Sequence, residues 1–209
     1  MRKILISLSL LLMALSSNLF AQEITPGKEV DLGLPSGTIW AGWNVGASSP
    51  EEYGGYYAWG ETEEKSEYAG STYEFYDCQT DYYTNIGSNI SGTKYDVARQ
   101  KWGGSWRMPT KAEFDELTSK CIWTWCQYKG VWGRKVTGPN GNSIFLPAAG
   151  LRSSTTLYED GEEGSYWCAS LFGDDGGLAW RLILFNGGYD SGYYEFCYNG
   201  LPVRPVKSK

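Results

Sequence analysis

The sequence predicts an α+β fold, with two helices in the first half of the chain and an antiparallel sheet in the second half. Residues 109–121 carry the stronger helix signal, because Thr110 can act as the N-cap and Glu113 can complete a capping box. The later chain is rich in β-branched and aromatic residues, and Asn140-Gly141 is a hairpin signal between two such runs. Helices that precede a run of strands are typical of the α+β class.

Glycine and proline interrupt the chain at short intervals after Asp31, which predicts many short strands. Residues 38–45 and 56–61 are expected to form the first strands. Residues 63–92 are polar and predict a long loop, and residues 95–102 predict a short helix that stops at a Gly-Gly pair. The remaining predicted strands are residues 123–128, 131–138, 143–150, 166–171, 178–185, 193–199 and 202–206.

The N-terminus predicts a secretory signal peptide over residues 1–21. Arg2 and Lys3 precede a short apolar run, and a small residue, Ala21, supplies a cleavage site. Residues 22–30 would be a short leader and residues 31–207 a single domain. Since the apolar run is too short to span a bilayer and no cysteine lies near the cleavage site, we expect an exported protein with neither a transmembrane nor a lipid anchor. It would be periplasmic, secreted or associated with the cell surface.

Composition excludes several functions. The formal net charge is −6 and no Lys/Arg cluster occurs, which argues against a nucleic-acid or anionic-membrane partner. The chain has no histidine, so it cannot use His-based acid–base or nucleophilic catalysis. We therefore expect a binding protein and not an enzyme, with no cofactor and no metal. The loops at residues 159–164 and 173–177 are acidic but lack calcium-loop spacing, and we interpret them as solvated turns.

Five cysteines in an exported chain suggest two disulfides and one free thiol, although the pairing is not readable from the sequence. The five are Cys78, Cys121, Cys126, Cys168 and Cys197. Three arginines beside Pro, Gly or Leu are expected to tie loops to the sheet, with Glu61 or Asp96 as candidate partners. They are Arg107, Arg152 and Arg204.

Five blocks of sequence resemble the Fibrobacter succinogenes major paralogous domain, a family common in exported proteins of gut Bacteroidetes. The blocks are residues 30–62, 101–117, 136–152, 165–170 and 200–206. The resemblance implies a C-type-lectin-like fold, in which two helices flank a small antiparallel sheet and the N- and C-terminal strands pair. Residues 38–45 would then lie beside residues 202–206. The Glu-Pro-Asn and Trp-Asn-Asp triplets of calcium-dependent lectins are absent, so calcium-dependent sugar binding is not implied.

The segment NGGYDSGYYEFCYN, residues 186–199, resembles the variable region of proteins diversified by retroelements, which share that fold. It is rich in Tyr, Asn, Asp, Ser and Gly and precedes a GLPVRPV tail, and all its non-glycine residues except Glu195 are compatible with adenine mutagenesis of Asn codons. The segment also has the composition of antibody loops, in which Tyr supplies rigid contact area.

We therefore expect an exported recognition or adhesion protein whose ligand is a protein or a glycan. An alternative is a structural, self-assembling envelope protein, and a formylglycine-generating-oxidase-like enzyme is a weaker one. The oligomeric state is left open. The predicted ligand-binding residues are Phe172, Asp174, Asp175, Asn186, Tyr189, Asp190, Tyr193, Tyr194, Tyr198 and Asn199.

Overall fold

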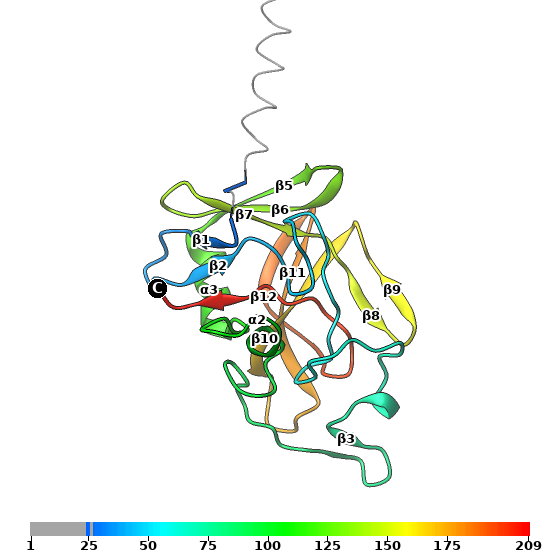
Figure 1. Cartoon of the computed structure of the whole chain (residues 1–209). Helices are drawn as coiled ribbons and strands as arrows, with labels where there is room; N and C mark the ends of the chain where they lie inside the picture. The colour runs from blue at the N-terminus through cyan, green and yellow to red at the C-terminus, as the bar shows by residue number, and fades with distance from the viewer. Residues whose placement is uncertain (1–23, 26) are drawn as a thin grey trace, which may run out of the picture.

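A computed structural model describes residues 24–25 and 27–209 (Figure 1). The predicted signal peptide and the start of the leader lie outside this part of the chain. Of the described residues, about 38% are in strands and 10% in helices, and the strands form five small separate sheets. Within the same range, no helix combines the length and apolar character needed to cross a membrane.

The α+β, C-type-lectin-like prediction is wrong at this level, because the protein is mostly β and its helices do not flank one small sheet. The shortness of α2 (Val97–Trp102) has a local cause, since Gly103 follows it with a φ of 67°. Only α3 (Lys111–Lys120) is a helix of more than two turns in the described chain. The helix signals were correct in position, but the arrangement of the strands decides the fold class.

The two ends of the domain meet in one three-stranded sheet. It has the order β1 (Glu29–Asp31), β2 (Ile39–Ala41) and β13 (Val206–Lys207), and Val206 lies opposite Trp40. The predicted pairing of the first and last strands is therefore confirmed, although both strands are shorter than predicted.

A second sheet contains β5 (Ile122–Tyr128), β6 (Val131–Thr137) and β7 (Ser143–Pro147), all antiparallel. The predicted turn at Asn140-Gly141 joins β6 to β7, and Gly141 has a φ of 87°, which favours glycine.

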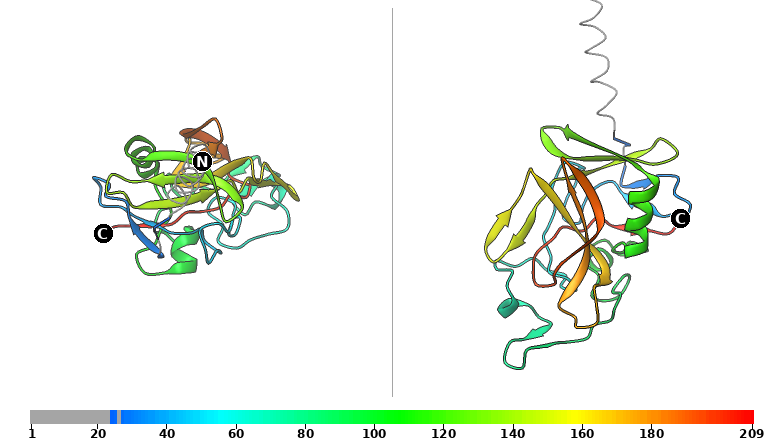
Figure 2. Two further views of the ribbon diagram at one scale, coloured as in Figure 1. Left: turned by 90° about the horizontal axis from the view of Figure 1, so that it is seen from above. Right: turned by 180° about the vertical axis from the view of Figure 1, so that it is seen from behind.

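The third sheet has the order β10 (Glu163–Leu171), β11 (Leu178–Phe185) and β12 (Gly188–Phe196). The predicted central, buried position of the LAWRLILF strand, β11, is confirmed. Strand β12 lies at the edge of the sheet, and α3 packs against it, as the rear view in Figure 2 shows.

The predicted long loop contains only short elements: η1 (Gly70–Thr72) and the hairpin of β3 (Tyr76–Asp77) with β4 (Tyr82–Tyr83). This hairpin lies at the opposite end of the molecule from β5 and β6 (Figure 1). A fifth small sheet pairs β8 (Leu151–Ser153) with β9 (Thr156–Tyr158).

The third sheet separates two apolar cores, because successive side chains of a strand point to opposite faces. Trp59, Trp167 and Ala179 belong to the core on one face. Phe114 of α3 and Leu182 belong to the core on the other face. The edge strand β12 therefore has one face toward each core, and this alternation decides which side chains of residues 186–199 reach the surface.

Candidate functional site

The exposed side chains of β12 are mainly aromatic. Tyr193, Tyr194 and Phe196 are 48%, 49% and 48% exposed. Tyr194 lies opposite Trp180 in the register, whereas Tyr193 lies opposite Arg181. Neighbouring tyrosines thus belong to different faces of the sheet.

Two ring stacks, one on the Trp180 face of the sheet and one at the end of β12, together form what we call the aromatic patch. The ring of Phe172 stacks on Tyr194 with centroids 4.1 Å apart and planes inclined by 14°, and it meets Trp180 edge-on at 4.7 Å. Phe196 stacks on Tyr198 at 5.0 Å. The Nζ atom of Lys111, at the start of α3, lies 5.0 Å from the Trp180 ring. The patch consists of Phe172, Trp180, Tyr194, Phe196 and Tyr198.

The other face carries a mostly buried polar cluster. Arg181 Nη1 lies 3.3 Å from Glu163 Oε1 and 3.8 Å from Glu195 Oε2, and it also contacts the hydroxyl of Ser165. Asn199 Nδ2 donates to Glu195 Oε1 at 3.0 Å. Burial raises the pKa of Glu163, although Arg181 and Ser165 act in the opposite direction. The Nε atom of Arg181 and the Oδ1 atom of Asn199 are buried and have no hydrogen-bond partner within the described part of the chain.

A cavity of about 600 Å³ lies between the β3–β4 region and the loop that joins β10 to β11. Its lining includes Trp59 and Tyr73, which are 1% and 4% exposed, and the ring of Tyr83. Asp81, Asp174 and Asp175 supply its carboxylates. The cavity therefore combines aromatic side chains with acidic ones.

The predicted binding residues do not form one site. Phe172, Tyr194 and Tyr198 belong to the aromatic patch, while Asp174 and Asp175 line the cavity.

Of the other predicted residues near the turn into β12, Asp190 is exposed and accepts a hydrogen bond from the Gly192 amide at 2.7 Å. The carbonyl of Asn186 accepts a hydrogen bond from Arg134 at 3.1 Å, so the backbone of this residue is tied to β6.

Two predicted residues support the fold. Tyr189 stacks on Trp123 of β5 with centroids 4.4 Å apart, and Asn199 is only 6% exposed. Neither side chain is displayed as a contact residue in the way that the sequence prediction requires. For Tyr189 the cause is the change in register between Arg181 and Ile183, which places it opposite Leu184 and turns its ring toward the second core. Asn199 follows the end of β12, and its side chain donates to Glu195.

Sequence reasoning missed several residues that the structure brings to these sites. Phe196 follows Tyr194 by two positions within β12, so the period of two along the strand could have identified it. Trp180 is placed opposite Tyr194 by the register. Tyr83 and Asp81 come from the predicted loop, which gave no signal that it would line a cavity.

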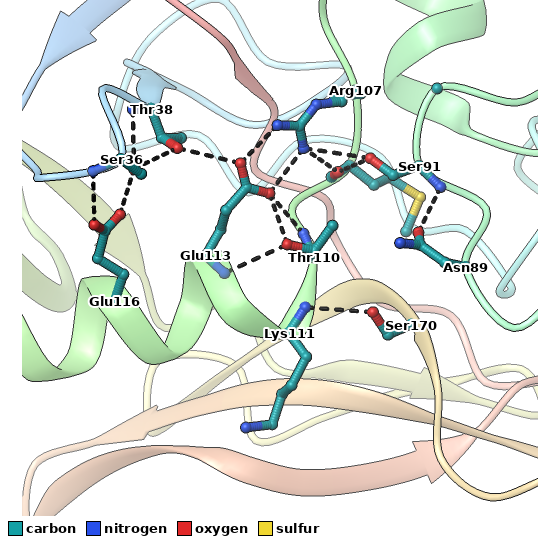
Figure 3. A network of polar contacts seen from close by, with 12 residues as sticks. Ser36, Thr38, Asn89, Ser91, Arg107, Thr110, Lys111, Glu113, Glu116 and Ser170 are labelled. Carbon is teal, nitrogen blue, oxygen red and sulfur yellow. Dashed lines mark hydrogen bonds and ion pairs between the residues drawn. The ribbon is translucent and has the colours of Figure 1, made fainter.

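The polar network around the N-terminus of α3 stabilises the fold (Figure 3). Arg107 makes a bidentate ion pair with Glu113: Nη1 donates to Oε2 at 2.7 Å and Nη2 donates to Oε1 at 2.6 Å. Glu113 also accepts hydrogen bonds from the Thr110 amide at 2.9 Å and from the hydroxyl of Thr38 at 3.2 Å. The predicted capping box is confirmed, and the partner of Arg107 is Glu113, not the predicted Glu61 or Asp96.

All five cysteines are free, so the prediction of two disulfides and one free thiol is wrong. Burial raises the pKa of Cys121 and of Cys168 to about 11, and burial also raises the pKa of Cys197. The thiolate, which is the nucleophilic form, is therefore disfavoured at neutral pH at these three positions. Among residues 24–25 and 27–209, no group of three or more Cys, Asp or Glu side chains is arranged to hold a metal ion.

Comparison with known proteins finds no match: no family model, no curated protein and no solved structure matches the chain. Membership of the Fibrobacter succinogenes major paralogous domain family therefore stays a prediction from the sequence blocks.

Proposed function

We propose that this protein is an exported recognition protein that binds a macromolecular ligand through the aromatic patch. The observation that carries the proposal is the exposure of Tyr194 and Phe196 on an edge strand, where each ring is stacked on a second aromatic ring. Large contiguous apolar surface on a protein marks an interaction site, whereas isolated exposed rings need no explanation.

The stacked rings suit recognition for two physical reasons. Stacking limits the rotation of each side chain before binding, so less conformational entropy is lost when the ligand arrives. The tyrosine hydroxyls of Tyr194 and Tyr198 add hydrogen-bonding groups at the edge of an otherwise apolar surface. The cation of Lys111 lies 5.0 Å from the Trp180 ring and is paired with Asp115, so it adds a polar rim and no net charge to this surface.

The experiment compares two surfaces of the same strand. Tyr194→Ser/Phe196→Ser removes the exposed part of the patch, and Tyr193→Ser removes a ring of equal exposure from the opposite face. A glycan array and a cross-linked pull-down from surface proteins identify a ligand, whose Kd is then measured with each purified variant. We expect the double variant to weaken binding at least about tenfold. Equal affinity for both variants would remove the patch as the binding surface.

Self-association is the competing use of the same patch. If the rings are buried between copies of the chain, the wild-type sedimentation coefficient will rise with concentration and that of Tyr194→Ser/Phe196→Ser will not. A monomer at all concentrations excludes the structural, self-assembling role.

Diversification by a retroelement is compatible with this surface, because Tyr194, Phe196 and Tyr198 all fall in the segment that resembles a variable region. A near-repeat of the coding region for residues 165–206 beside a reverse transcriptase gene would support it.

Export is tested separately by mass spectrometry of the protein from its host, for which we expect a mature N-terminus at Gln22. An intact N-terminus at Met1 would contradict export through a cleaved signal.

A further inference from the structure

The cavity between the β3–β4 region and the β10–β11 loop is a second candidate site, on residues distinct from the aromatic patch. Its walls come from two segments far apart in the sequence, and backbone contacts hold them together. The amide of Leu171 donates to the carbonyl of Ser88 at 2.9 Å, and Asn89 pairs with Ser170 in an isolated antiparallel β-bridge. A Cβ atom added to Gly177 would lie only 3.0 Å from the Tyr83 ring, so loop and ring pack closely.

The two buried aromatic groups of the lining, Trp59 and Tyr73, already use their polar atoms within the fold. The indole nitrogen of Trp59 donates to the carbonyl of Cys168 at 2.9 Å, and the hydroxyl of Tyr73 donates to the carbonyl of Trp59 at 2.7 Å. These groups therefore offer apolar and π surface to anything that enters the cavity, not hydrogen bonds.

The exposed lining is acidic and contains no basic residue. It includes Asp81, Asp174 and Asp175, and no ion pair among the described residues neutralises any of the three. Asp81 accepts a hydrogen bond from the hydroxyl of Tyr76 at 2.8 Å, and Asp175 accepts one from the Gly177 amide at 3.0 Å. Both bonds orient the carboxylates and leave their negative charge in place.

The electrostatics of Tyr83 agree with this charge distribution. Burial is the main reason why the pKa of Tyr83 is raised, and the carboxylates of Asp175 and Asp81 are further causes. A cation in the cavity would interact favourably with the same field.

The three carboxylates do not converge on a point in the way that a metal ion requires. A larger cation with spread charge and an apolar stem matches them better, because the stem can lie on the aromatic lining while the charged end reaches the carboxylates. We propose that the cavity binds an arginine side chain of a basic peptide. This inference does not rest on the aromatic patch being the ligand site of the proposed function.

The first test is a titration of the mature protein with fluorescein-labelled pentapeptides that contain two arginines, two citrullines or two glutamates between glycines. Citrulline is the neutral counterpart of arginine with nearly the same shape. We expect the arginine peptide to bind at least about fivefold more tightly than the other two, and its affinity to fall as NaCl is raised from about 50 mM to about 500 mM. Equal affinity for the citrulline peptide would overturn the proposal in favour of a neutral ligand.

The second test removes the charges and keeps the acceptors. In Asp81→Asn/Asp174→Asn/Asp175→Asn the amide oxygens can still accept the hydrogen bonds from Tyr76 and Gly177. We expect the arginine peptide to bind at least about fivefold more weakly. The matched control neutralises three exposed carboxylates outside the cavity, in Glu67→Gln/Asp160→Asn/Asp190→Asn, and should bind like the wild type. The same loss in both triple variants would show a net-charge effect and no site.

A third variant serves as an independent check if the triple variant is poorly folded. Thr84 is exposed on the cavity wall, so Thr84→Arg supplies a tethered guanidinium that competes with the peptide. Thr156→Arg places the same group on an exposed residue of β9 as a control. Blocked binding with Thr84→Arg alone supports the proposal. Unchanged binding with Thr84→Arg, or displacement of the peptide by calcium with a rise in Tm, would overturn it.

The two proposals fail separately. Tyr194→Ser/Phe196→Ser should leave the affinity for the arginine peptide unchanged, because neither residue lines the cavity. Loss of peptide binding in that variant would place the cation on the aromatic patch instead.

Discussion

Two arginines, one buried and one partly exposed, show how differently the junction of the chain ends and the third sheet are built. Arg204, next to the terminal sheet, is 0% exposed and donates to Asn44 Oδ1 at 2.8 Å and to the carbonyls of Ala41 and Phe145 at 3.1 Å and 2.9 Å. Arg181, in the third sheet, has longer ion pairs and a buried Nε atom without a partner.

The hydrogen bonding of the two guanidinium groups differs: that of Arg204 is fully used within the fold, whereas that of Arg181 is not. Every nitrogen of the Arg204 guanidinium has an acceptor, so this residue can only tie the chain together. Burial lowers the pKa of Arg204 to about 10, because its neighbours are mainly neutral oxygens. Around Arg181 the side chains of Glu163, Glu195 and Asn199 leave hydrogen-bonding capacity beside the exposed rings of β12.

The largest effect is expected at the closed junction. Arg204→Met would leave one amide oxygen and two carbonyls buried without a donor, and we expect the free energy of unfolding to fall by about 3 kcal/mol or more. Arg181→Met should cost less, about 2 kcal/mol, because its ion pairs are longer and water still reaches the side chains of the cluster, which are 12–16% exposed. Urea unfolding at pH 7 measures both variants. If Arg204→Met kept the wild-type free energy of unfolding, or if both variants lost the same amount, the proposed difference between the two arginines would be contradicted.

An intermediate effect with a pH signature is expected at Glu113. Burial acts to raise its pKa, but hydrogen bonds from Arg107 and the Thr110 amide outweigh burial and hold the pKa below its ordinary value of 4.5. A depressed pKa stabilises the folded state above pH 4.5, and this stabilisation is lost as the pH falls through the folded-state pKa.

Glu113→Gln should therefore lower the free energy of unfolding by about 1–2 kcal/mol at pH 7 and by less at low pH. Urea unfolding between pH 7 and pH 3 tests this expectation, with Glu67→Gln as the exposed control. A Glu113→Gln curve parallel to that of the wild type at all pH values would contradict the ion-pair assignment.

The smallest effect is expected from reducing agent, which should leave Tm unchanged because all five cysteines are free. A thiol reagent on the native protein should modify Cys78 rapidly, since it is the only exposed cysteine of the five. The other thiols should react fully only after unfolding. Fewer than five thiols in denaturant without reductant would show that a disulfide forms after all.

Sequence reasoning succeeded where the signal is local. The capping box of Thr110 and Glu113 and the Asn140-Gly141 turn depend on residues within a few positions of each other, and both are present. The central position of β11 followed from its apolar side chains on both faces. The fold class was wrong because it depends on how many separate sheets the strands form, which no local pattern encodes.

The binding residues were only partly predictable for the same reason. Composition identified residues 186–199 as unusual, but a register change after Arg181 turns Tyr189 toward Trp123, while Asn199 is buried. The cavity joins Tyr83 to Asp174, which are far apart in the chain, and no spacing rule relates them.

The sequence by itself determined the helix starts, the tight turns, the apolar central strand and the aromatic character of the C-terminal segment, because short-range sterics and hydrogen bonds control these features. Only the tertiary structure decided which rings of β12 reach the solvent and which carboxylates line one cavity. Those outcomes depend on strand register and on packing between distant segments, where a shift of one residue exchanges the buried and exposed faces.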